Sequence, residues 1–489
     1  MSTETTIFIG VAIYMVMMIG IGLYASKKSH SVTDFMIAGR GLPTSLLTMT
    51  VIATWFGGST IMGGAGAAYD DGMLGVIEDP WGGALAIILI GLFFVRTFHR
   101  LKIITVADFM AMRFGRIAGI AIMCVTIFAN TVWVGSMLVA FGLIFFSLTG
   151  IPLEVGVIAG AIVIVFYTAV GGMWAVALTD FVQMCIVIVG VVTLFTVVLI
   201  DVGGWDAIAR HLDEDTFRMT PLENDSTTWL HYFRAWAIIG LVDITAQTLF
   251  QRASSAKSER VAQNSFYLGG LGYLVFGLVP VFIGIIASVS MPGLEKSESV
   301  IPTMMIEHLH PIAVAVFVGA LLAAIMSSAD SALLSVASVL SRNLLPLFKK
   351  NPSERVSLNV ARYSIPVIGL IAIVVALQFQ SVFALMVDSN ILGLAIILVP
   401  FVFGIWWSKA NRTGALATMV VGTVVWITTL NVAPHLPADF IGFVAGFFTM
   451  LIVTPLTQKF DPPRALVDGD GNAIDTKDRL GTLPLFKRS

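Results

Sequence analysis

The sequence predicts an all-α integral membrane protein with about 13 transmembrane helices. Hydrophobic residues make up 57% of its 489 residues, charged residues only 12%, and the mean hydropathy is +0.92. So few charged side chains cannot cover a soluble globule of this length. Apolar stretches of about 20 residues, long enough to cross a bilayer as a helix, recur from end to end. A membrane β-barrel would instead show alternating segments of about ten residues.

The apolar stretches place the predicted helices in order along the chain. They lie at 6–25, 45–69, 80–98, 119–148, 153–171, 179–202, 229–251, 263–291, 308–340, 361–379, 382–406, 413–430 and 437–458. The first is predicted to be a retained helix rather than a signal peptide, because its positive charges follow the apolar run. Residues 459–489 are polar and rich in Pro and Gly, and are predicted to form a loosely ordered tail.

The distribution of basic residues predicts the orientation in the membrane. If the N-terminus is outside, all Lys and Arg except Arg210, Arg218, Arg234 and Lys296 fall on the inner side, which is 24 of 28. Inner loops of membrane proteins carry such an excess. The expectation is a multi-pass protein of the plasma (inner) membrane, with the N-terminus outside and the C-terminus cytoplasmic.

Motifs of soluble catalytic sites are missing from the sequence. It contains no GxxxxGK[ST], HExxH or GxSxG, and its two cysteines form no CxxC motif. We therefore expect no enzyme activity, no nucleic acid partner and no obligate protein partner. The functional evidence therefore comes from polar groups within the apolar stretches. Placing ionisable and polar groups at membrane depth costs free energy, so such groups usually mark functional sites.

The second predicted helix, TVIATWFGGSTIMGGAGAAY, is rich in glycine and hydroxyl groups. These small residues fit a close helix packing face. They also fit a broken helix, whose freed backbone carbonyls line a cavity and coordinate a cation.

The stretch AAIMSSADSALLSVASVLSR, residues 323–342, carries small residues at helical steps of three and four. A stripe of small residues alone indicates helix packing. Packing does not explain Asp330, because an ionised carboxylate at membrane depth needs a cation, a partner or water. Ser327, Ser328 and Ser331 add neutral oxygens, the ligands that a hard alkali cation prefers.

A third polar stretch, YTAVGGMWAVALTDFVQ at 167–183, passes through a short glycine-containing turn into the sixth predicted helix. Thr179 or Asp180 near that turn fits a helix cap as well as an ion contact.

These stretches, together with SVTDFMIAGRGLP and QTLFQRASSAKSERVAQ, resemble the sodium:solute symporter family. The resemblance covers residues 31–343 and implies a LeuT-like fold of five plus five inverted helices. It implies an N-terminal peripheral helix (1–30), a first repeat (45–202), an inverted second repeat (229–406), two peripheral helices (413–458) and the cytoplasmic tail (459–489).

The resemblance also implies a sodium site shared within the family. Its ligands here would be the carbonyls of Ala53, Phe56 and Ala324 and the hydroxyls of Ser327 and Ser328. A second sodium position described in some members would use Asp180 with Ser327 and Ser331. Asp330 stands where some of those members have a serine, so it either adds to that position or changes its chemistry.

Within the family the motifs are closest to the high-affinity choline transporter branch, and the match includes Trp55 and Trp133. Aromatic faces bind quaternary ammonium groups through cation–π attraction. Further aromatic walls of that branch correspond to Gly83 and Ala246 here, which leaves the predicted cage incomplete.

Other candidate solute-binding residues are polar. Asp79, in an acidic loop, and Asp243, one turn from Ala246, would favour a cationic or amino-bearing solute if they face the pocket. A solvated loop and a buried structural acid are the alternatives for these two. Ser59, Thr60 and Gln247 could supply orienting hydrogen bonds.

The predicted function is sodium-coupled import of a small polar organic solute by alternating access, with Na+ as the coupling ion and the lipid bilayer as the surroundings. A choline-like cation is the favoured solute, with proline, a sugar or a carboxylate as alternatives. A sodium-conducting channel-like protein and a membrane sensor on the same fold are the alternative classes.

Overall fold

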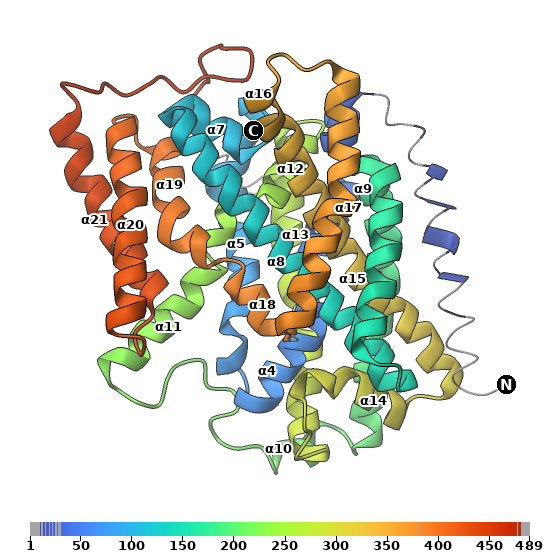
Figure 1. Ribbon diagram of the computed structural model, residues 1–489. Coiled ribbons are helices and arrows are strands. Elements are labelled where there is room, and N and C mark those ends of the chain that lie inside the picture. The colour runs from blue at the N-terminus through green and yellow to red at the C-terminus, as the bar shows by residue number, and fades with distance from the viewer. Residues whose placement is uncertain are drawn as a thin grey trace, which may run out of the picture.

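The structure is a computed structural model that describes residues 31–379, 381–476 and 478–480, together with separate positions between 10 and 27. The predicted helix at 6–25, and with it the N-terminal segment 1–30, therefore lies largely outside the described residues. Figure 1 shows a bundle of helices that run roughly side by side. The described residues form no strand, only isolated bridges between Leu42 and Ala256 and between Val467 and Ala473.

The helices of the first half are α2 (Val32–Ile37), η1 (Ala38–Arg40), α3 (Thr44–Trp55), η2 (Ser59–Gly63), α4 (Gly64–Asp71), η3 (Leu74–Val76), η4 (Ile77–Gly82), α5 (Gly83–Leu89), η5 (Ile90–Phe94), α6 (Val95–Leu101), α7 (Val106–Phe114), α8 (Arg116–Thr149), α9 (Leu153–Asp201) and α10 (Trp205–Ala209). Those of the second half are α11 (Ser226–Ile238), η6 (Val242–Thr245), α12 (Gln247–Ser255), α13 (Glu259–Ser290), η7 (Ser297–Ser299), α14 (Val300–His308), α15 (Pro311–Val339), η8 (Leu340–Leu344), α16 (Leu345–Phe348), α17 (Glu354–Phe379), α18 (Val382–Asp388), η9 (Gly393–Ile397), α19 (Leu398–Trp406), α20 (Arg412–Val432) and α21 (Ala438–Thr457).

Several of these helices are preceded by a residue whose side chain caps the helix N-terminus. Ser31 and Thr105 form capping boxes with the acids three positions on, and the side chains of Asp225, Ser258 and Asn411 accept hydrogen bonds from the first turns of their helices. Such caps satisfy backbone N–H groups that have no partner within the helix.

Among the described residues, 9 helices are long and apolar enough to cross a membrane, or up to 11 if each of two bent pairs counts as one span. A shorter apolar helix, Leu153–Phe166, covers the predicted span at 153–171. The spans agree with the predicted ones from 45 onward, although the total of 13 is not reached because the first stretch lies outside the described residues.

The predicted turn between the fifth and sixth spans is a sharp kink within α9. Gly172 there has φ of +65°, a left-handed conformation that glycine adopts without strain. A Cβ atom at this position would lie 2.7 Å from the Phe35 ring. Glycine therefore permits both the kink and the close approach of α2.

Burial separates the core of the bundle from its periphery. In the most apolar window of the span Ile312–Phe348, which contains α15, 83% of residues are buried, compared with 22% in each of α20 and α21. α15 packs against α8, α9, α17 and α3, whereas α20 and α21 form a hairpin at one edge (Figure 1). The serines of α15 are therefore at the centre of the molecule.

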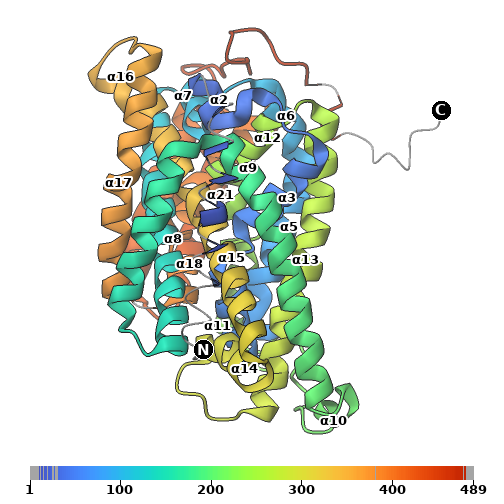
Figure 2. The ribbon, with the colours of Figure 1, turned by 90° about the vertical axis from the view of Figure 1, so that its right-hand side faces the viewer.

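The described part of the tail lies across one end of the bundle, the end where α2 and α7 lie, and opposite α10 and α14 (Figure 2). Lys102 bonds Asp468 at 3.0 Å and Asp470 at 3.2 Å, and Arg96 bonds Asp478 at 2.7 Å. The bond from Lys102 and the backbone N–H of Asn472 lower the pKa of Asp468 to about 2. Basic side chains at the helix ends therefore contact the described part of the tail, and its loose ordering stays a prediction.

Candidate functional site

The second membrane span is broken, as one of the two interpretations of its glycines predicted. Between Thr44–Trp55 and Ser59–Asp71 the axis bends by 56°. The N–H of Gly57 donates to the carbonyl of Trp55 at 2.7 Å, rather than to that of Ala53 four residues back. The break therefore releases the Ala53 carbonyl from the helical hydrogen-bond pattern.

Two serines of α15 meet this released carbonyl. The hydroxyls of Ser327 and Ser328 donate to the Ala53 oxygen at 3.3 and 3.2 Å, and Ser327 also contacts the Ala324 carbonyl at 2.9 Å. All four residues are fully buried. Ligand oxygens about 2.4 Å from a hard cation lie about 3.4 Å apart in an octahedral shell, so these separations suit one sodium ion.

Phe56 is the residue at which the helical backbone of α3 ends, with φ of −71° and ψ of 68°. It is fully buried beside the break. The hydroxyls of Ser327 and Ser328 donate hydrogen bonds to Ala53 and Ala324 rather than to Phe56. That the Phe56 carbonyl binds sodium, like the assignment of the other four ligands, stays a prediction.

Gly57 explains how α3 and α15 approach so closely. A Cβ atom there would overlap Ser328 Oγ. The two interpretations of these glycines, a broken helix and a close packing face, are therefore compatible. The helix is broken at this point, and the neighbouring helix packs closely against the break.

The predicted span at 229–251 is also broken, which the sequence analysis missed. Its two parts, Ser226–Thr245 and Gln247–Ser255, meet at 45°. Ala246 between them is extended, with φ of −63° and ψ of 121°. A 3-10 turn at η6 precedes this residue, so the apolar run does not continue as one regular helix.

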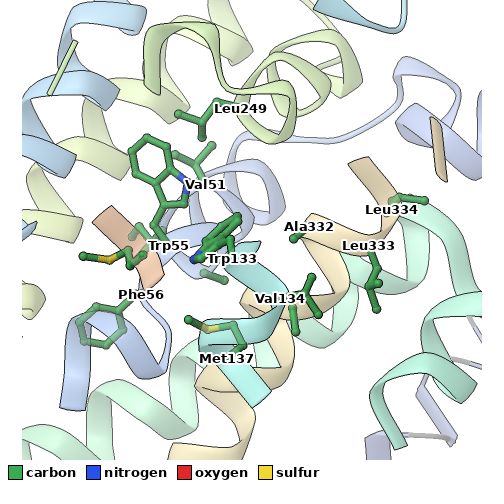
Figure 3. Packing of buried hydrophobic residues seen from close by; sticks show 14 of the residues in the cluster. Val51, Trp55, Phe56, Trp133, Val134, Met137, Leu249, Ala332, Leu333 and Leu334 are labelled. Atoms are coloured by element: carbon green, nitrogen blue, oxygen red, sulfur yellow. The ribbon is translucent and has the colours of Figure 1, made fainter. Parts of the chain in front are cut away.

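A cavity of about 80 Å³ lies between the two breaks. Seven of the eight predicted solute-binding residues line it: Trp55, Ser59, Asp79, Trp133, Asp243, Ala246 and Gln247. Figure 3 shows the indole rings of Trp55 and Trp133 near the point where α3 ends at Phe56. None of the described residues that line the cavity is Lys, Arg or His.

Asp79 is not in a solvated loop at the mouth, because it is only 2% exposed. Its carboxylate accepts hydrogen bonds from Thr60 at 2.6 Å and from the hydroxyl of Tyr273 at 2.5 Å. Thr60 also contacts the Trp55 carbonyl at 2.9 Å. Thr60, the eighth predicted residue, therefore lies behind the lining, where it links Asp79 to the broken helix.

Tyr273 on α13 lines the cavity and was missed by the sequence analysis. Its ring lies edge-on to Trp55, with centroids 6.3 Å apart. A Cβ atom at Gly83 would lie 2.8 Å from the Tyr273 ring. Tyr273 thus occupies the space beside Gly83, where the resemblance implied an aromatic wall from another helix. No local sequence pattern in α13 distinguishes this tyrosine. Its place in the cavity wall depends on contacts with Trp55, Thr60 and Asp79, which lie on other helices.

Gln247 lines the cavity, but both ends of its amide have backbone partners. Its oxygen accepts from the N–H of Val106 at 2.7 Å, and its nitrogen donates to the carbonyl of Ile104 at 3.0 Å. Gln247 therefore ties the start of α12 to the segment before α7. Asp243, on the other side of the break, is partly exposed to the cavity, and its side chain is hydrogen-bonded to Asn390, which also lines the cavity.

The structure brings the residues predicted for a second ion position together around an arginine that the sequence analysis did not single out. Arg252 on α12 is fully buried, donates to Ser331 Oγ and lies 3.8 Å from Asp180 Oδ2. Asp180 also accepts a hydrogen bond from Thr50 at 2.5 Å. Ser331 contacts Asp330 at 3.3 Å. The sequence signal that could have marked Arg252 is its position directly after the uncharged stretch ITAQTLFQ, at the end of a predicted span.

Broken membrane helices around a central polar cavity define this protein as a membrane transporter. The model of the sodium:solute symporter family matches residues 35–422. The chain belongs to this family, so it is a sodium-coupled symporter and not an enzyme, as the sequence predicted.

Relatives and solved structures agree with this membership. The high-affinity choline transporter 1 of Caenorhabditis elegans is 28% identical, over 88% of this chain and 79% of the relative. The sodium/proline symporter of Staphylococcus aureus is 26% identical, over 96% and 95%. A Na+-coupled sialic acid symporter has the same fold, with a TM-score of 0.80, 21% identity and coverage of 94% and 99%. The LeuT-like fold prediction is confirmed.

Proposed function

We propose that this chain imports a small organic cation of the choline type together with sodium. The observation that carries the proposal is the composition of the cavity, which aromatic and acidic side chains surround without a basic residue among the described lining residues. A carboxylate solute would find no positive partner there.

The aromatic part of the lining suits a quaternary ammonium group. Trp55 and Trp133 are 7% and 9% exposed, so each ring is held by packing and offers only part of its surface to the cavity. Tyr273 adds a third ring next to Trp55. A cation over a desolvated aromatic face gains about 2 kcal/mol, which a neutral solute of the same shape does not.

The acidic part of the lining supplies the counter-charge. Asp243 is partly exposed to the cavity, whereas Asp79 is held by Thr60 and Tyr273. We assign Asp243 to direct contact with the cationic group and Asp79 to the support of the aromatic wall. Ser59 lines the same cavity and can orient a hydroxyl of the solute.

Relatives named as choline transporters support a choline-type solute, among them the human protein at 27% identity over 90% of this chain. Ala246 leaves the cage open on one side, because its methyl group covers less of the cavity than an aromatic ring would. The cavity should therefore also accept organic cations bulkier than choline.

The sodium ion is assigned to Ala53, Phe56, Ala324, Ser327 and Ser328. We assign residues 45–202 and 229–406 to the two inverted repeats, with 413–458 peripheral. Each repeat then begins with a broken helix, and an ion held between α3 and α15 bridges the two repeats. Such a bridge lets sodium binding bias alternating access.

The orientation follows from the basic residues. The end of the bundle that the tail crosses carries Arg96, Arg100 and Lys102. We assign this end to the cytoplasm and the N-terminus to the outside of the plasma (inner) membrane, since inner loops are enriched in Lys and Arg.

Uptake into proteoliposomes tests the proposed solute. With an inward sodium gradient, labelled choline should accumulate, unlabelled quaternary ammonium compounds should compete, and sugars and carboxylates should not. Betaine and proline belong in the same panel, because each carries a positive nitrogen beside a carboxylate. Preferential uptake of a sugar or a carboxylate would refute the proposal of a cationic solute.

A further inference from the structure

Arg252 is among the largest side chains that are fully buried in the described part of the molecule. It lies on α12, beyond the break of the seventh predicted span. A buried guanidinium at membrane depth is tolerated only with charged and hydrogen-bonding partners. Its partners therefore indicate what it does.

Those partners come from three helices. Arg252 Nη1 donates to the Thr248 carbonyl of its own helix at 3.3 Å. Nη2 donates to Ser331 Oγ on α15 and lies 3.8 Å from Asp180 Oδ2 on α9. The charge of Asp330 on α15 acts on both Arg252 and Asp180. Arg252 thus uses a carboxylate and a hydroxyl that were predicted to hold a second sodium ion.

We propose that Arg252 is the resident cation of this second position, so that the protein binds one sodium ion per transport cycle. The inference rests on the proposed sodium site at Ala53 and α15. The guanidinium already uses Asp180 Oδ2 and Ser331 Oγ, two of the oxygens that a second ion would need.

Charge balance supports a single ion. With both carboxylates ionised, Asp180 and Asp330 contribute two negative charges, and Arg252 contributes one positive charge. One sodium ion, held at the neutral oxygens of Ala53, Ser327 and Ser328, brings the sum to zero. Asp180 Oδ1 accepts no hydrogen bond from any described residue. The protein's own hydrogen bonds therefore leave part of this negative charge uncompensated.

The charged cluster and the sodium site are directly connected. Ser331 donates to the Ser327 carbonyl at 2.8 Å, and the Ser327 hydroxyl contacts Ala53. Thr50, which bonds Asp180, precedes Ala53 by one turn of α3. An ion at the shared site is therefore next to the groups whose charge it balances.

Equilibrium binding of radioactive sodium to the purified full-length protein tests the inference without a solute. The wild type should bind one ion per chain. Arg252→Gln leaves two carboxylates without a resident cation and should bind two ions. Arg252→Lys keeps the charge and should bind one. Two ions bound to the wild type, or only one to Arg252→Gln, would overturn the inference.

A double variant covers the case in which Arg252→Gln does not fold. Arg252→Gln/Asp180→Asn removes both members of the buried pair, leaves one carboxylate and should again bind one ion. Two ions in this variant would also overturn the inference. Absence of saturable sodium binding in the wild type would refute the proposed function as well, whereas two ions in the wild type would leave that function standing.

Discussion

Ser328 on α15 donates a hydrogen bond of 3.2 Å to the carbonyl of Ala53, at the break of the second membrane span. The two residues are 275 positions apart and lie in the segments assigned to opposite repeats. An ion bound between them interacts with both segments at once. The free energy of sodium binding therefore depends on how the two repeats are placed relative to each other.

Loss of a serine hydroxyl should weaken sodium binding. Ser328→Ala, and separately Ser327→Ala, should raise the sodium concentration for half-maximal uptake more than tenfold, which is about 1.4 kcal/mol. Sodium-dependent uptake into proteoliposomes measures this. Ser335→Ala is the matched control, because Ser335 is a buried serine of the same helix whose hydroxyl has no partner among the described residues. Equal sodium dependence in the Ser328 and Ser335 variants would exclude the site.

A methyl group at the helix break should act on the same site. Gly57→Ala places a Cβ atom against Ser328 Oγ, so α15 and α3 must separate and sodium affinity should fall at least tenfold. Gly64→Ala, on the other side of the break, meets no atom closer than 4.0 Å and should leave sodium affinity unchanged. Sodium binding to both purified variants provides the comparison. Unchanged affinity in Gly57→Ala would show that close packing at the break is not required.

Trp55 should act on the solute before it acts on sodium. Trp55→Ala removes an aromatic face of the cavity and should weaken binding of a quaternary ammonium solute by about 10-fold to 30-fold, the equivalent of about 2 kcal/mol at most. Trp55→Phe keeps an aromatic face and should lose less. Solute binding at saturating sodium measures the effect. A Trp55→Ala variant with normal affinity for the solute would rule out cation–π binding at this ring.

Asp243 should distinguish charge from shape. Asp243→Asn should lower the affinity for choline at least tenfold, but not that for an uncharged compound of the same shape such as 3,3-dimethylbutanol, because only the cation loses an electrostatic partner. Competition against labelled solute gives both affinities. Asp70→Asn, at an exposed acid near the end of α4, is the control. Parallel losses for both compounds would assign Asp243 a structural role instead.

The sequence was sufficient for most of the fold because membrane spans are encoded locally. A run of about 20 apolar residues must be a helix in the bilayer, since its backbone groups have no other partners there. Clustered glycines and hydroxyls also marked the break at Ala53 to Gly57. The break at Ala246 was missed because its flanking residues keep an apolar average and no glycine cluster marks it.

The site was less predictable where long-range contacts decide it. Asp330 was recognised as a group that needs a partner, but Arg252 could not be identified as the neighbouring cation. The two are far apart in sequence, and only the packing of α12 against α15 brings them together. Tyr273 was missed for the same reason, because its role depends on the space that Gly83 leaves open.

Coupled flux in both directions tests the central claim most directly. In proteoliposomes, an inward sodium gradient should drive accumulation of labelled choline, and an inward choline gradient should drive uptake of radioactive sodium. At sodium concentrations that are half-maximal for the wild type, both fluxes should fall strongly in Ser328→Ala. Sodium flux that continues at the same rate without any solute would contradict the claim, because it would indicate a channel-like protein and not a symporter.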